Sequence, residues 1–198
     1  MAPRLGLGVT VALLAMGCTS PHVFRLPRAA ATPACLVPVP ERELLIGIAM
    51  SGGGSRAALF GAAGLQALGG LRTADGSSAL ERVSYLSSVS GGSLAAAYYV
   101  INKPPRSVSV LTPDGTMSAA YRGFFERYTA ALSQNFGGAL VRRQLGSFRW
   151  FNPALAAGSL AEVLRKRLVG DTTLLDLSRR QARGDSPGLI IKIGRAHV

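Results

Sequence analysis

Two segments of the chain share one arrangement: an apolar run of strand length, a turn of small residues, and a helix-forming stretch. The first begins with Leu44–Met50, turns through Ser51–Arg56 and continues as a predicted helix over 57–68. The second begins with Val83–Ser88 and continues, after its own turn, as a predicted helix over about 93–101. Continuous apolar strands are typical of parallel sheets covered by helices. The repeat therefore predicts right-handed α/β units around a parallel sheet.

The first turn carries three successive glycines, Gly52, Gly53 and Gly54. Their backbone N–H groups would lie beside the positive end of the following helix, which makes the turn an anion site. One use is phosphate binding, because the glycines fit a loose dinucleotide fingerprint and Asp75 follows at about the required distance. The other use is an oxyanion hole, in which the same donors stabilise a tetrahedral intermediate.

The second turn, Ser88-Val89-Ser90-Gly91-Gly92, favours the oxyanion hole. Small residues two before and two after Ser90 permit the tight strand–turn–helix geometry of a nucleophile elbow. A nucleotide fold needs an acidic residue at this strand tip, whereas Asp75 precedes the strand. A plainer alternative makes Ser90 the N-cap of a Ser/Gly-rich helix. Two neighbouring loops, one rich in donors and one offering a hydroxyl, indicate catalysis by Ser90.

No histidine is placed to activate Ser90. His22 lies in a proline-rich stretch and His197 is the penultimate residue. A Ser-His-Asp triad needs a histidine on the fold. We therefore expect a carboxylate to act alone as the base.

Together, Ser51-Gly52-Gly53-Gly54-Ser55-Arg56 and Ser88-Val89-Ser90-Gly91-Gly92 resemble the motifs of the patatin-like phospholipases, and the glycine loop is similar to that of the related cytosolic phospholipases. The resemblance is strong over 44–101 and weak over 171–191, where 174–177 and 187–191 resemble the family's later strand region. It implies a three-layer α/β/α hydrolase fold, incomplete in this chain. It also implies a Ser–Asp dyad with no cofactor or metal, acting on phospholipids or lysophospholipids.

By position, the resemblance makes Ser90 the nucleophile, Gly52, Gly53 and Gly54 the oxyanion hole, and Arg56 a support for the oxyanion. Ser51 stands where plant-type members have Asp, and Ser88 stands where the elbow usually has Gly. Both replacements are small and leave these roles unchanged.

The family's aspartate lies in an Asp-Gly-Gly/Ala turn well after the nucleophile. Here Asp75 precedes Ser90, Asp114 follows it too closely in a proline-bounded loop, and Asp185 lacks the glycine. We therefore expect the catalytic Asp to lie beyond this chain, which would be inactive by itself. Residues 193–198 resemble a translated sequencing adapter and are expected to be a non-native tail.

The N-terminal residues 1–18 have the pattern of a targeting segment. Residues 1–18 combine Arg4 with a short apolar stretch and end at Cys18 in the manner of a bacterial lipoprotein signal peptide. An ordinary secretory signal is the alternative. Acylated Cys18 would anchor the protein to a membrane surface and leave Cys35 without a disulfide partner. No Asp follows Cys18, which favours the periplasmic face of the outer membrane. Proline-rich 19–43 would be a tether, and 44–192 the first part of the hydrolase domain.

Two later helices are expected, over 117–132 and over 159–168, the second with Ser159 and Glu162 at capping-box spacing. The first carries an aromatic stripe, which indicates core packing or, alternatively, a lipid-contacting lid.

The net charge of +12 is spread over the chain without a long basic run, so no nucleic-acid partner is expected. Two other functions stay open: a nucleotide-binding module and a non-catalytic, lipid-binding lipoprotein.

Overall fold

The computed structural model describes residues 45–146 and 153–192. A short 3₁₀ helix, Ala79–Arg82, precedes the second strand, and a π-helical turn, Arg165–Val169, follows α6. The regular elements are, in chain order, β1 (Ile46–Met50), α2 (Gly54–Gly70), β2 (Val83–Val89), α3 (Gly91–Asn102), α4 (Ala119–Leu132), α5 (Phe136–Gly146), α6 (Pro153–Leu164), α7 (Leu174–Ala182) and β3 (Gly188–Lys192).

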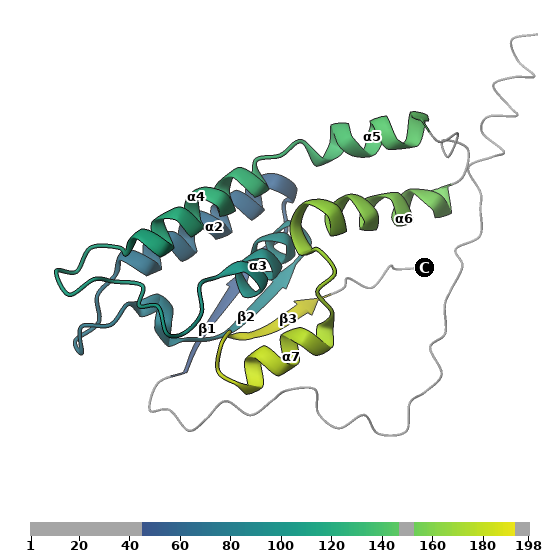
Figure 1. Cartoon of the computed structure of the whole chain (residues 1–198). Coiled ribbons are helices and arrows are strands. Elements are labelled where there is room, and N and C mark those ends of the chain that lie inside the picture. The colour runs from purple at the N-terminus through teal and green to yellow at the C-terminus, as the bar shows by residue number, and fades with distance from the viewer. Residues whose placement is uncertain (1–44, 147–152, 193–198) are drawn as a thin grey trace, which may run out of the picture. The chain divides into compact units, whose positions relative to one another are not determined.

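The three strands form one parallel sheet in the order β1-β2-β3 (Figure 1). Met50 pairs with Ser88, and Val89 pairs with Lys192, so the three strands end at the same edge. We call it the carboxyl edge and the opposite one the amino edge. Parallel neighbours require a crossover between each pair of strands, and helices make these crossovers here. The predicted α/β class with a parallel sheet is confirmed.

Helix α3 is the central helix of the core. It contacts all three strands, and both α2 and α4 pack against it and against each other. Glycine permits the close approach of α2: a Cβ at Gly61 would lie 3.3 Å from the Cβ of Ala95 and 3.3 Å from the Sδ of Met50. Small residues therefore bring α2 and α3 together directly behind the carboxyl edge.

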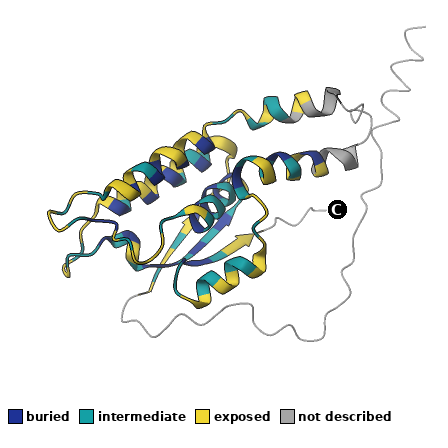
Figure 2. Cartoon of the chain, viewed as in Figure 1, coloured by how far each residue is buried: buried dark blue, intermediate teal, exposed yellow. Residues whose placement is uncertain are grey.

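The aromatic stripe of α4 is core, as Figure 2 shows by its dark blue inner side. Tyr121, Phe124, Phe125, Tyr128 and Leu132 are all buried. The Tyr128 hydroxyl donates to the Ala95 carbonyl at 2.7 Å, which ties α4 to α3. Burial raises the pKa of Tyr121 to about 12. The alternative of a lipid-contacting lid is wrong.

The structure corrects two sequence predictions in the later half of the chain. Ser159 is buried within α6 and is not its N-cap, because this helix already begins at Pro153. Residues 174–177 start α7 instead of forming a strand, whereas the strand expected within 187–191 is confirmed as β3. The sequence analysis also did not predict α5.

A capping box opens α7. The Thr173 hydroxyl accepts from the Asp176 N–H at 3.2 Å, and the Asp176 carboxylate accepts from the Thr173 N–H at 3.0 Å. The Thr173 hydroxyl also donates to the Asp176 carboxylate at 2.6 Å, and this hydrogen bond, followed by that from the Thr173 N–H, lowers the pKa of Asp176. Thr173-x-x-Asp176 has the same spacing as Ser159-x-x-Glu162, so spacing by itself did not distinguish a helix start from a helix interior.

Within the described ranges, none of the helices is both long enough and apolar enough to cross a membrane.

Replacement of Phe124 by Ala tests the aromatic core. Phe124 is 1% exposed, and its removal should lower the free energy of unfolding by about 3–5 kcal/mol, because a large cavity would open. Phe60, 81% exposed on α2, is the matched control, and Phe60→Ala should change stability by about 0.5 kcal/mol or less. Urea unfolding of the purified chain measures both. Equal losses for the two variants would contradict the assignment of α4 to the core.

Candidate active site

The glycine loop and the Ser90 turn meet at the carboxyl edge. They follow β1 and β2, which are parallel neighbours, so both turns emerge side by side. A Cβ built on Gly52 would lie 3.3 Å from the Cβ of Ser90 and 3.9 Å from its Oγ. The structure thus brings together the two turns that the sequence analysis singled out, and Ser90 is exposed to solvent.

Ser90 has a strained backbone, with φ 53° and ψ −123°. Among residues 45–146 and 153–192 it is the only non-glycine residue with positive φ. Such a conformation costs about 1–3 kcal/mol and persists where the surroundings enforce it, commonly at functional sites. Ser90 occupies the N-cap position of α3, yet its side chain makes no capping hydrogen bond. The alternative that Ser90 is simply the N-cap of α3 therefore accounts for its position, but it gives the Ser90 hydroxyl no capping role.

The two glycines after Ser90 allow the turns to touch. A Cβ on Gly91 would lie 2.0 Å from the Gly54 carbonyl oxygen, and a Cβ on Gly92 would lie 2.6 Å from the Ser51 carbonyl oxygen. Neither distance is possible for a side-chain carbon. Glycine is therefore required at both positions for the start of α3 to lie against the glycine loop.

Two helices begin at this point, and both present uncompensated positive ends. Helix α2 has Gly53 as N-cap, α3 has Ser90, and neither cap provides a side-chain hydrogen bond. Neither helix has an acidic residue in its first turn. Arg56, exposed in the first turn of α2, adds a full positive charge. The local field therefore favours negative charge beside the Ser90 hydroxyl.

The family model for patatin-like phospholipase matches residues 48–187, from within β1 to the residue before β3. The chain belongs to the patatin-like phospholipase family. No curated protein and no solved structure gives a significant match. The patatin-like phospholipases are a family of lipid acyl hydrolases, which hydrolyse ester bonds.

Three aspartates of the patatin-like domain lie at the amino edge, away from Ser90. Asp75 and Asp185 precede β2 and β3 respectively. Asp114 lies in a turn whose Gly115 packs against Arg72, as does Gly76 of the Asp75 turn. Strand β2 has seven residues, which span about 23 Å. Asp75 is thus at the wrong edge for the nucleotide-binding alternative as well as for pairing with Ser90.

An apolar groove, which the sequence analysis missed, begins at the glycine loop. Its volume is about 470 Å³, and it runs from Ser51 between β1 and α2, past Gly61 and Leu65 to Leu71. Phe60, also lining the groove, is largely exposed. The apolar faces of 46–50 and 57–68 were visible in the sequence, but the gap between them depends on packing.

Metal ligands do not gather in the part of the chain that the structure describes: no group of three or more His, Cys, Asp or Glu side chains is placed to hold an ion.

Replacement of Gly91 by Ala tests the contact between the two turns. The added methyl group would overlap the Gly54 carbonyl, so Gly91→Ala should lower the free energy of unfolding by about 1–3 kcal/mol. Gly64→Ala, in α2, is the control, because nothing lies within 4 Å of its Cβ position and alanine favours helix by about 1 kcal/mol. Urea unfolding measures both variants. If Gly91→Ala is as stable as the parent, the two turns do not pack as described.

Proposed function

We propose that this patatin-like protein hydrolyses acyl esters of membrane lipids, of the phospholipase A or lysophospholipase type, with Ser90 as the nucleophile. The observation that carries the proposal is the position of Ser90: a solvent-exposed hydroxyl on a strained turn, packed against a loop of three glycines at two helix N-termini. This is the arrangement that acyl transfer through a serine requires.

In the proposed reaction the Ser90 Oγ attacks the ester carbonyl carbon while its proton passes to a carboxylate base. The carbonyl oxygen becomes an oxyanion and accepts hydrogen bonds from backbone N–H groups of Gly52, Gly53 and Gly54. Arg56 and the positive ends of α2 and α3 stabilise the same charge. Collapse of the intermediate breaks the ester bond while the base returns its proton to the departing alcohol of the lipid. Water then attacks the acyl-serine in a second, equivalent step, which releases the fatty acid and restores the Ser90 hydroxyl.

The base in this proposal is an aspartate encoded beyond Lys192, in an Asp-Gly-Gly or Asp-Gly-Ala turn. The location of Asp75, Asp114 and Asp185 at the amino edge supports it, since none of them can reach Ser90 without unfolding the sheet. A chain that lacks the base would be inactive, because a serine hydroxyl is a weak nucleophile until its proton is removed.

The apolar groove between β1 and α2 supports a lipid substrate. It starts at Ser51, next to the proposed oxyanion hole, and its lining is predominantly apolar. A fatty acyl chain lying in this groove would place its ester carbonyl at the glycine loop. Burial of each CH₂ group contributes about 0.8 kcal/mol, so even a partly seated chain would orient the ester.

Substitution of Ser90 tests the nucleophile in the complete gene product. A fluorophosphonate probe should label the parent, and Ser90→Ala should lose both the label and hydrolysis of phospholipid esters, because the attacking oxygen is gone. Ser87→Ala, on the same strand, is the control and should keep both activities. Lipid hydrolysis by Ser90→Ala at the parental rate would refute the assignment.

We further propose that Cys18 carries lipid chains and anchors the protein at the periplasmic face of the outer membrane. Cys18 lies outside the described residues, and the support is the signal-like sequence of residues 1–18. An anchor would keep the enzyme on the surface that contains its substrate. Two acyl chains suffice for stable attachment, whereas one is marginal.

Metabolic labelling with a palmitate analogue, after expression in a bacterium with an outer membrane, tests the anchor. The parent should be labelled and recovered with membranes, and Cys18→Ala should lose the label, since the acceptor sulfur is absent. Cys35→Ala is the matched control and should be labelled like the parent. Equal labelling of Cys18→Ala and the parent would exclude Cys18 as the lipidation site.

A further inference from the structure

A second, larger cavity opens at the amino edge of the sheet, at the opposite end from Ser90. Its volume is about 860 Å³, within the range of small-molecule sites. Its walls come from the 73–77 turn, the start of β2, the segment 103–110 that follows α3, and the segment 181–187 that precedes β3. Neither the family assignment nor the proposed reaction uses this cavity.

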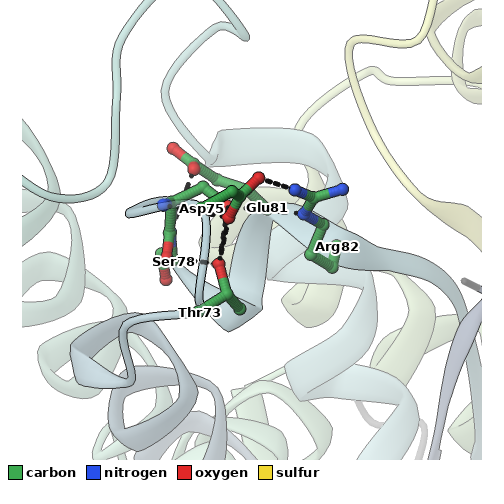
Figure 3. Close-up of polar contacts among 6 residues, drawn as sticks. Thr73, Asp75, Ser78, Glu81 and Arg82 are labelled. Carbon is green, nitrogen blue, oxygen red and sulfur yellow. Dashed lines mark hydrogen bonds and ion pairs between the residues drawn. The ribbon is translucent and has the colours of Figure 1, made fainter.

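The carboxylates in its wall already have partners. Asp75 pairs with Arg82, and Glu81 accepts from the Ser78 N–H at 3.1 Å (Figure 3). Glu81 also accepts from the Val110 N–H at 2.8 Å. Asp185 accepts from the Nε of Arg183 at 2.9 Å. These acidic groups therefore serve to hold the loops together.

Two cations in the wall lack a carboxylate partner within the described residues. Lys103 donates to the Pro104 carbonyl at 3.1 Å and makes no ion pair there. Arg106 makes no hydrogen bond or ion pair in that part of the chain, and its guanidinium lies against Gly184, where a Cβ would be 2.8 Å from Nη1. Burial, together with the nearby charges of Arg180 and Arg106, lowers the pKa of Lys103 to about 8, against the opposing influence of Asp185 and Glu81. A bound anion would supply Lys103 and Arg106 with the counter-charge that they lack among the described residues.

A buried hydroxyl lines the same cavity. Ser186 is 7% exposed, and its Oγ has no hydrogen-bond partner among the described residues. A buried polar group left unpaired costs about 1–3 kcal/mol, which a ligand oxygen would recover. Ser186 and Arg106 both line this cavity, and Gly184, against which the Arg106 guanidinium lies, is two residues before Ser186 in the chain.

We propose that this cavity binds a small organic phosphate monoester, with the phosphate group held by Lys103, Arg106 and Ser186. Two cations match the charge of a phosphate dianion, and ammonium, guanidinium and hydroxyl groups supply donors for its oxygens. The organic part of the ligand would pack against Tyr121 and Val108, which also line the cavity. The site needs neither Ser90 nor a catalytic aspartate, so it stands independently of the proposed hydrolase reaction.

Isothermal titration of the 198-residue chain with phenyl phosphate, inorganic phosphate and phenol tests the proposal. Phenyl phosphate should bind saturably and phenol should not. Lys103→Met should weaken phenyl phosphate binding about ten-fold or more, because a charge-assisted hydrogen bond is lost. Arg106→Met should act in the same direction; Arg106 is exposed, so this variant avoids a loss of folding. Arg127→Met, an exposed arginine of α4 outside the cavity, is the charge-matched control and should bind like the parent.

The outcomes separate the ligand sources and the two sites. If inorganic phosphate binds as tightly as phenyl phosphate, the anion site is supported, but the proposed contacts with the organic group of the ligand are wrong. Ser90→Ala should bind phenyl phosphate like the parent, whereas loss of binding in that variant would place the ligand at the carboxyl edge and overturn the proposal. Unchanged affinity in both Lys103→Met and Arg106→Met, with folding verified by circular dichroism, would also overturn it.

Discussion

The packing of the Ser90–Gly92 turn against the glycine loop is the contact on which the candidate site depends. Gly91 and Gly92 approach the carbonyl oxygens of Gly54 and Ser51 more closely than any side chain would allow. This contact fixes the starts of α2 and α3 relative to one another and holds Ser90 at positive φ. The strain at Ser90 persists because two strands, two turns and two helices surround it. Loosening any of these would let the serine relax to an ordinary backbone conformation.

The aromatic core gives that contact its rigid support. Helix α4 covers α2 and α3, and the Tyr128 hydroxyl is bonded to the Ala95 carbonyl one turn into α3. Tyr98 and Tyr128 stack with ring centroids 5.0 Å apart. The side chains that hold the two helices in place are thus apolar and lie behind the carboxyl edge. The polar and strained groups lie in front of it, where substrate would enter.

The two edges of the sheet have different chemistry for a structural reason. At the carboxyl edge the helices begin, so unpaired N–H groups and positive helix ends gather there. At the amino edge the long connections before β2 and β3 bring in charged side chains, some of them paired, as between Asp75 and Arg82. Of the described residues that line the amino-edge cavity, Lys103 and Arg106 are cations without a carboxylate partner, which is why this cavity, like the carboxyl edge, favours an anion.

Features set by short-range preferences could be predicted from sequence. Each strand–turn–helix unit is encoded within about twenty consecutive residues, as apolar runs, small-residue turns and helix formers, so both units and Ser90 as the candidate nucleophile were recognised. The aromatic stripe of α4 was recognised for the same reason, because its period is local.

Tertiary structure decided what spacing could not. Ser159 and Thr173 head similar four-residue patterns, and only packing buried the first within a helix and left the second at a helix start. The distance of Asp75 from Ser90 and the cavity joining Lys103 to Ser186 depend on segments far apart in sequence, whose contact arises because parallel strands pair and place their ends at common edges.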